Sequence, residues 1–317
     1  MVVRHVDLCA GSGAFTLALQ DALGSTCVFA NDMCTYSKQT YDANFTHELL
    51  CQDIHQIDPA DVPEHDVLTA GFPCQSFSNA GLKLGFADER ANVFLKVVEI
   101  MKACKPRVAV LENVRGLLQH DGGRTFDIIV SSLAEIGYSV KWALLNTKVH
   151  TDIPQNRERV YIYCFRDTED AALVDATFEP CAAQRPLSSF LLDKDVVIGN
   201  KYYYTAKSRI YDRLVKGVVK RGVFYRFYRS RLLQNREGEC SCLMAAMGSG
   251  GNNVPLLLDE RGIRKLTVRE VFRLQGFPDS YVLPENVTNY RMYKIAGNAV
   301  TVSLAKLVVA RLAILFE

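Results

Sequence analysis

The sequence lacks any apolar run approaching the roughly 20 residues that a membrane-spanning helix needs. Its N-terminus, MVVRHVDLCAGSG, lacks the basic region, apolar stretch and small-residue cleavage site of a secretion signal. Of the 317 residues, 49% are apolar and 23% charged, a balance typical of globular proteins with a sizeable core. We therefore expect no membrane insertion and no secretion, and a cytoplasmic location.

Paired metal-ligand spacings are also missing. The ten cysteines are scattered, and Cys240 and Cys242 are too close together for a CxxC zinc knuckle. The six histidines form no HxxxH pair. The sequence therefore predicts free thiols in a reducing compartment and no metal site.

Net charge is small, but its distribution is uneven. Residues 199–236 hold eleven Lys or Arg residues against one acid, Asp212, so this segment carries +10. Because the whole chain carries +2, the remainder carries about −8. The segment is also rich in aromatic residues, which is typical of a surface that binds a polyanion. For a charge run alone, a solvated basic face is the more common alternative.

The first half of the chain alternates strand-like and helical apolar patterns, which predicts an α/β fold with a parallel sheet covered by helices on both faces. The predicted strands are VRHVDLCA, TCVFAND, DVLTAGF, RVAVLENV, YSVKWALLN and RVYIYCF, and the predicted helices span 14–23, 91–104 and 124–136. We expect the last two strands to include an antiparallel edge. Residues 299–316 predict one buried apolar helix that returns to the first domain. The predicted domains are 1–177 plus 290–317, and a smaller one over 178–289.

The turn DLCAGSGAF, residues 7–15, places two glycines between a strand and a helix, where backbone amides approach an anion or a methionine carboxylate closely. The third glycine of the dinucleotide fingerprint is missing, and a merely tight connection is an equal alternative. Asp32 ends the second strand, where an acid bonds ribose hydroxyls. Asp53 follows at the expected end of a third strand, where a carboxylate can accept an adenine amino proton or simply cap a loop.

Reactive side chains follow three further strands. GFPCQSFS at 71–78 places Cys74 on a loop at the carboxyl end of a strand, where open α/β sheets carry their sites. Most cysteines are buried inert thiols, but the flanking Gly, Pro, Gln and Ser indicate a loop. Glu112 ends another strand, and Arg157 and Arg159 precede the next one. A solvated carboxylate and two surface arginines are the alternatives for these three residues.

Taken together, these motifs resemble those of the DNA cytosine-5 methyltransferases, in the family's order and over nearly the whole chain. The matching segments are the DLxAG-type turn, GFPCQ, ENV, QxRxR, LTVREVFRLQGFP at 266–278 and IAGNAV at 295–300, whereas residues 181–240 do not match. The resemblance implies a Rossmann-like S-adenosylmethionine-dependent methyltransferase fold with a second, smaller target recognition domain. It also implies S-adenosyl-L-methionine as cofactor, double-stranded DNA as partner and a monomeric enzyme.

The resemblance assigns roles to the reactive residues. Cys74 adds to carbon 6 of a flipped-out cytosine, Glu112 serves ring nitrogen 3, and Arg159 holds the carbonyl oxygen of the base. Arg157 braces the pocket. The implied cofactor residues are Cys9, Ala10, Gly11, Gly13, Phe15, Asp32, Met33, Asp53, Ile54, Pro73, Asn298 and Val300, although the family usually has an aromatic residue at the position of Cys9 and often at that of Met33. The implied DNA contacts are Gln75, Ser78, Lys83, Arg90, Arg226, Arg229 and Arg231.

Two other classes share these features. A tRNA cytosine-5 methyltransferase carries a Pro-Pro-Cys-Gln centre, so Gly71 and Phe72 favour DNA. A catalytically silent DNA-binding protein is disfavoured by the presence of Cys74, Glu112 and Arg159 together. The simplest context is a stand-alone modification enzyme of a restriction-modification system, associated with the nucleoid in a bacterium or located in the host cell of a virus.

Overall fold

The computed structural model describes residues 2–73, 93–228, 231–249 and 253–317. Its chain divides into two compact units, the first formed by residues 1–146, 158–179 and 304–317 and the second by residues 147–157 and 180–303. These units differ from the predicted domains at three places, because residues 147–157 and 290–303 belong to the second unit and residues 178–179 to the first. The assignment of functional domains remains a prediction.

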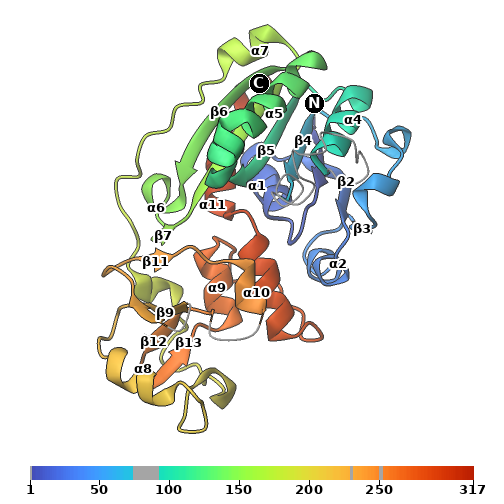
Figure 1. Cartoon of the computed structure of the whole chain (residues 1–317). Coiled ribbons are helices and arrows are strands. Elements are labelled where there is room, and N and C mark those ends of the chain that lie inside the picture. Colours follow the sequence, from blue (N-terminus) through green and yellow to red (C-terminus); the bar gives the residue numbers. More distant parts are fainter. Residues whose placement is uncertain (1, 74–92, 229–230, 250–252) are drawn as a thin grey trace. The chain divides into compact units, whose positions relative to one another are not determined.

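The first unit is built on a seven-stranded sheet of order β3-β2-β1-β4-β5-β8-β6, with helices alongside it (Figure 1). Its strands are β1 (Arg4–Leu8), β2 (Thr26–Asp32), β3 (Leu50–Cys51), β4 (Val67–Gly71), β5 (Val108–Val114), β6 (Ser139–Asn146) and β8 (Glu158–Phe165). Its helices are α1 (Ala14–Leu23), α2 (Thr35–Asp42), α4 (Val93–Cys104), α5 (Arg124–Glu135) and α7 (Thr168–Leu173). The predicted alternation of strands and helices is confirmed.

The predicted antiparallel edge is confirmed. β6 forms the edge of the sheet and pairs antiparallel with β8, which also pairs antiparallel with β5 and so lies inside the sheet. Burial agrees with these positions: the side chains from Val160 to Phe165 are all fully buried, whereas most of β6 is partly exposed and Trp142 is 48% exposed. Full burial of a strand on both faces is typical of the covered interior of an α/β sheet.

Residues 299–316 form a shorter helix than predicted. α10 (Asn289–Asn298) ends before Ala299, whose backbone is extended, and α11 (Val302–Ala310) is followed by a short 3₁₀ turn, η9 (Ala313–Leu315). The backbone groups at this break have partners outside a helix, since Val302 N–H donates to Gln275 O at 2.9 Å. The stretch Asn289–Ala310 is long and apolar enough to cross a membrane, but 72% of its most apolar window is buried, as in a core segment.

The second unit contains a four-stranded sheet of order β10-β9-β12-β13 and a parallel pair, β11-β7. Its strands are β7 (Gln155–Asn156), β9 (Tyr225–Tyr228), β10 (Arg231–Gln234), β11 (Cys240–Ser241), β12 (Leu256–Leu258) and β13 (Ile263–Lys265). Its helices are α6 (Thr147–His150), α8 (Tyr211–Gly217), α9 (Val268–Leu274) and α10. A small core around Leu214, Tyr225 and Leu256 holds α8 against the sheet.

Candidate active site

The turn between β1 and α1 has a backbone that only certain residues can follow. Cys9, Gly11 and Gly13 all have positive φ, at 54°, 56° and 71°. At Gly13, a Cβ atom would lie 2.3 Å from the ring of Phe45 and 2.9 Å from that of Tyr41. Glycine at position 13 is therefore required both by the backbone and by the close approach of α2 and the loop after it.

Asp32, at the end of β2, holds this turn from the side. Its Oδ2 accepts the N–H of Gly11 at 2.9 Å and its Oδ1 accepts the N–H of Cys34 at 2.8 Å. Burial raises the pKa of this carboxyl group, and the two backbone hydrogen bonds oppose that shift. The carboxylate is thus fixed beside the turn, at the carboxyl end of the parallel strands.

The other residues predicted near the cofactor in this unit differ in exposure. Phe15 is buried and packs edge-on against Tyr161, with ring centroids 6.5 Å apart. The Met33 side chain is 72% exposed. The Cys9 thiol lies in surroundings that exclude water, and this burial strongly raises its pKa and keeps it protonated. Ile54 is buried in the short 3₁₀ helix η1 (Ile54–Gln56).

Asp53 caps η1, because its Oδ1 accepts the N–H of His55 at 3.0 Å. This is the loop-capping arrangement that the sequence left open beside the adenine contact. The cap fixes the carboxylate at the end of β3, next in sheet order to β2 and Asp32.

Glu112 on β5 and Arg159 on β8 form an ion pair between neighbouring strands. Arg159 Nε lies 3.0 Å from Glu112 Oε1, and the two side chains are 14% and 10% exposed. Val114 is the residue opposite Arg159 in the register of β5 and β8, so Glu112 and Arg159 are diagonal neighbours on one face of the sheet. This pair places a carboxylate and a guanidinium together at the carboxyl end of β5.

Asn113, between them in sequence, ties down the segment after β4. Its Nδ2 donates to Phe72 O at 3.0 Å, and its Oδ1 accepts the N–H of Val114 at 2.8 Å. The backbone that leads to the exposed Pro73 is thereby anchored beside Glu112. Five predicted site residues that follow Pro73 lie outside the described residues: Cys74, Gln75, Ser78, Lys83 and Arg90.

Arg157 belongs to the second unit and is only 2% exposed. Its Nη1 donates to Leu243 O and its Nη2 to Ala299 O, each at 2.7 Å. Gln155, two residues earlier, donates to Leu274 O at 2.8 Å and accepts the N–H of Leu243 at 3.0 Å. Arg157 also donates to Gly297 O, so it holds the backbone on both sides of the break after α10, whereas Gln155 holds Leu243 and Leu274 beside it.

That break carries the last two predicted cofactor residues. Asn298 is exposed at the end of α10, and Val300 is buried two residues later. Gln275 holds this segment as well, through Nε2 to Ala296 O at 2.6 Å. The conformation of the AGNAV segment is therefore stabilised by side chains of two motifs distant in sequence, Arg157 of QNR and Gln275 of LQGFP.

Two of the predicted base-reading arginines, Arg226 and Arg231, lie on paired strands. β9 and β10 pair antiparallel, with Arg226 opposite Leu233 and Arg231 opposite Tyr228. Arg229 lies outside the described residues. Arg226 is half-buried and Arg231 is exposed, as are Lys216 and Lys220 in and after α8.

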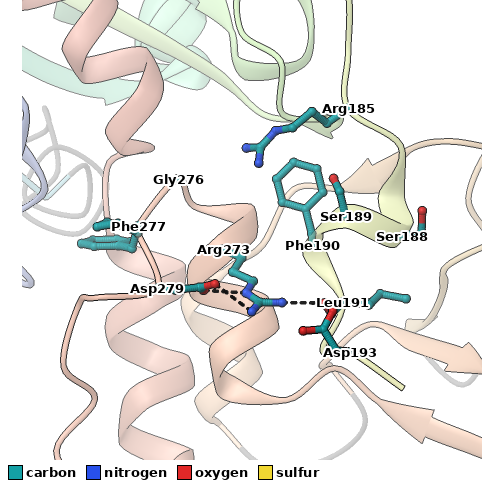
Figure 2. Close-up of a pocket in the computed structure, with 11 residues that line it drawn as sticks. Arg185, Ser188, Ser189, Phe190, Leu191, Asp193, Arg273, Gly276, Phe277 and Asp279 are labelled. Atoms are coloured by element: carbon teal, nitrogen blue, oxygen red, sulfur yellow. Dashed lines mark hydrogen bonds and ion pairs between the residues drawn. The ribbon is translucent and has the colours of Figure 1, made fainter. Parts of the chain in front are cut away.

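A polar pocket of about 400 Å³ opens elsewhere in the second unit (Figure 2). Figure 2 shows Arg273 between Asp279 and the carbonyl of Leu191, and Nε of Arg273 lies 2.7 Å from Oδ1 of Asp279. Arg185 is likewise paired with Asp152 at 2.7 Å. Both arginines have acidic partners, and the lining includes none of the predicted site residues.

Within the described part of the chain, no group of three or more His, Cys, Asp or Glu side chains could hold a metal ion. Asp7, which opens the turn motif, is not among the site residues predicted from the sequence. Asp7 is fully buried and hydrogen-bonded on both oxygens. An acid inside an otherwise apolar strand is the signal that could have drawn attention to it.

The turn held by Asp32 at the end of β2 and the ion pair of Glu112 with Arg159 at the end of β5 lie at the carboxyl ends of parallel strands, where open α/β sheets carry their sites. A family model for the C-5 cytosine-specific DNA methylases matches residues 3–313, and the chain belongs to that family. The family and the fold class predicted from the sequence are thereby confirmed.

Individual relatives are similar over almost their whole length. The chain is 37% identical to the Type II methyltransferase M.Bsp6I of Bacillus sp. (strain RFL6), covering 96% of each protein. It is 38% identical to M.NgoBI of Neisseria gonorrhoeae, covering 94% of this chain and 89% of that protein. The fold is shared with a Spodoptera frugiperda DNMT2 variant, with a TM-score of 0.77 at 21% identity over 99% of this chain and 100% of that one.

Proposed function

We propose that this enzyme transfers a methyl group from S-adenosyl-L-methionine to carbon 5 of a flipped-out cytosine within a specific sequence of double-stranded DNA. The observation that carries the proposal is the pairing of Glu112 with Arg159 beside the segment that Asn113 anchors. Cys74 follows that segment two residues after Phe72. An acid, a cation and a nucleophile are then grouped at the carboxyl end of β4 and β5.

The chemistry requires all three groups. Carbon 5 of cytosine is a weak nucleophile until a thiolate, supplied by Cys74, adds to carbon 6 and breaks the 5,6 double bond. Glu112 holds a proton at ring nitrogen 3, and Arg159 stabilises the charge that develops on the base's carbonyl oxygen. After methylation, loss of the carbon 5 proton and departure of the Cys74 thiolate restore the double bond and the enzyme.

The β1-α1 turn fits the cofactor. Gly11 and Gly13 give the turn its left-handed backbone, α1 begins there without a side-chain cap on Gly13, and Asp32 stands at the neighbouring strand end. When bound, S-adenosyl-L-methionine supplies the methyl group from its sulfonium. The turn residues Ala10, Gly11 and Gly13 would lie against its methionine portion and Asp32 against its ribose, with Asp53 and Ile54 at the adenine.

Several side chains shape the site without touching the base. Arg157 fits a positioning role, because its guanidinium is committed to the carbonyl oxygens of Leu243 and Ala299. It would keep Asn298 and Val300 in place for the methionine portion of the cofactor. Met33 and Cys9 would contact the adenine in place of the aromatic residues usual in the family.

DNA recognition is assigned to the second unit, with the basic segment 199–236 as its main surface. Exposed Lys216 and Lys220 suit phosphate contacts, and the paired strands β9 and β10 present Arg226 and Arg231 as base readers. Gln75, Ser78, Lys83, Arg90 and Arg229 complete the proposed DNA contacts. The similar proteins named Type II methyltransferases support a place in a restriction-modification system, and we propose that the enzyme is monomeric and cytoplasmic.

The decisive experiment is bisulfite sequencing of DNA from cells that express the wild-type chain or Cys74→Ser. We expect methylated cytosines in one recurring sequence with the wild type and none with the variant, since a serine hydroxyl is far less ionised than a thiol at neutral pH. A duplex with 5-fluorocytosine at that site should trap a covalent adduct on wild-type protein only. Methylation by Cys74→Ser, or methylation of tRNA in preference to duplex DNA, would refute the proposal.

A further inference from the structure

Asp7 forms a buried junction at the end of β1. It is fully buried, and its Oδ2 accepts the side-chain hydroxyl of Thr16 at 2.9 Å and the N–H of Thr16 at 3.2 Å. Its Oδ1 accepts the hydroxyl of Thr69 at 2.9 Å. One carboxyl group thus joins β1 to the first turn of α1 and to β4.

The contact with Thr16 takes the place of an N-terminal helix cap. α1 starts after Gly13, which has no side chain to cap the helix, and the first turn of α1 contains no acid. The N–H groups of the first turn have no partner within a helix, and a side chain normally accepts one of them. Here Asp7 does so from the preceding strand, across the whole turn from Cys9 to Gly13.

The contact with Thr69 reaches toward the nucleophile. Thr69 lies on β4, three residues before Phe72, whose carbonyl oxygen Asn113 holds. Thr16 continues the network on the other side, since its hydroxyl lies 3.2 Å from that of Tyr41, and the Tyr41 ring packs where a Cβ on Gly13 would be. Asp7 is therefore hydrogen-bonded both to α1, which follows the cofactor turn, and to β4, which leads to Cys74.

We propose that Asp7 is a positioning residue that fixes the cofactor turn, Cys9–Gly13, relative to β4, the strand that leads to Cys74. This inference rests on the proposed function only for the identity of the ligand. The carboxyl group is surrounded by Asp32, Cys9, Cys27 and Tyr41, all of them neutral or anionic. Its part in the site is therefore to accept hydrogen bonds, and it forms no ion pair with any of the described residues.

An amide can replace this carboxyl group. Burial raises the pKa of Asp7 to about 7, so its neutral form is well populated near neutral pH. In Asp7→Asn, the amide oxygen can keep both contacts with Thr16. The Thr69 hydroxyl has a second acceptor, Val6 O at 3.3 Å, and can turn to it while accepting an amide N–H. Asp7→Ala removes both side-chain oxygens that accept hydrogen bonds from Thr16 and Thr69.

The test compares Asp7→Ala, Asp7→Asn and a matched control, Tyr138→Phe. Tyr138 is a buried residue of the first unit whose hydroxyl donates to Pro106 O at 2.9 Å, with no contact to the turn. Affinity for S-adenosylhomocysteine is measured by calorimetry, and KM is measured separately for S-adenosyl-L-methionine and DNA. Amide hydrogen exchange at Gly11 and Thr16 is followed without ligand.

We expect Asp7→Ala to weaken S-adenosylhomocysteine binding and raise the cofactor KM at least about tenfold, with the KM for DNA unchanged. Asp7→Asn should stay within about threefold of wild type, and Tyr138→Phe should lose stability but no affinity. Exchange at Thr16 should quicken only in Asp7→Ala. If Asp7→Ala does not fold, Thr69→Val, which removes one hydroxyl, should still weaken binding measurably.

Normal binding and exchange in Asp7→Ala, or normal binding in Thr69→Val where it is the variant used, would overturn the inference, as would an equal loss of binding in Tyr138→Phe. A wild-type protein that does not bind S-adenosylhomocysteine would instead count against the proposed function. The exchange measurement decides the role of Asp7 in that case as well, because it needs no ligand.

Discussion

Gly13 and Gly24 mark the two ends of α1 and provide a matched pair of substitutions. Both have left-handed backbones, with φ of 71° and 59°. A Cβ at Gly24 meets nothing within 4 Å, whereas one at Gly13 would lie 2.3 Å from Phe45 and 2.9 Å from Tyr41. Gly24→Ala therefore measures the backbone cost alone, and Gly13→Ala measures that cost plus the clash.

The expected magnitudes follow from this difference. A left-handed conformation costs an alanine roughly 1–2 kcal/mol, which applies to both variants. Overpacking adds about 1–3 kcal/mol at Gly13. Little relief is available there, because the Phe45 ring is itself packed on Tyr41 with centroids 4.4 Å apart. Gly13→Ala should thus be destabilised by roughly 2–5 kcal/mol against about 1–2 kcal/mol for Gly24→Ala.

The assay pairs urea unfolding with calorimetric titration of S-adenosylhomocysteine. We expect Gly24→Ala to bind like wild type, and Gly13→Ala to bind at least about tenfold more weakly, equivalent to about 1.4 kcal/mol, because the turn must shift to admit the methyl group. Equal destabilisation of the two variants would show that Phe45 and Tyr41 move aside freely. Equal affinity for S-adenosylhomocysteine would show that Gly13 does not shape the cofactor site.

Four further predictions concern other parts of the molecule. Glu112→Gln should lower the single-turnover rate roughly 10²- to 10⁴-fold at unchanged DNA affinity, and an unchanged rate would leave this residue a positioning role only. Arg157→Met should leave two buried carbonyl oxygens without their donors and lower the free energy of unfolding in urea by roughly 1–3 kcal/mol for each. Wild-type stability would show that these hydrogen bonds do not hold the backbone. Burial lowers the pKa of His5 from 6.5 to about 3, so the stability it contributes is present above pH 6.5 and is lost as pH falls toward 3. Urea midpoints between pH 6.5 and 5 should fall in wild type and less in His5→Gln, and parallel profiles would refute this. Lys216→Ala or Lys220→Ala should weaken binding to all DNA sequences alike and lower the salt slope by about one for each phosphate that the protein no longer neutralises, whereas an unchanged slope would remove them from the interface.

The strands of the first unit and its helices α1, α4 and α5 could be predicted because each of them is specified locally, whereas α2 and α7 were not predicted. Gly24, for example, ends α1 with a left-handed backbone, as its position after an apolar helical pattern indicates. The position of β8 between β5 and β6 could not be predicted, since strand order depends on contacts between distant segments. The break after Asn298 was missed for the same reason, because Gln275 and Arg157 create it from elsewhere in the chain.

Prediction of the site shows the same division. Glu112 and Arg159 were selected by their places at strand ends, and the register of β5 and β8 explains why they meet. Arg157 has the same residue type and lies two positions away, yet it is buried and bonded to backbone carbonyls. Nothing in the local pattern distinguishes the two arginines. Asp7 was missed because its partners, Thr16 and Thr69, lie 9 and 62 residues away in sequence.

Neither compact unit is encoded by one continuous stretch of gene, since the chain passes between them after residues 146, 157, 179 and 303. A fragment cut at 180 and 303 would lack Gln155 and Arg157, whose hydrogen bonds hold Leu243 and Ala299. Expressing the second unit alone should therefore give a poorly folded product. To exchange sequence preference between relatives, a single segment within 181–240 should instead be replaced. The recipient's own QNR and LQGFP segments should be kept.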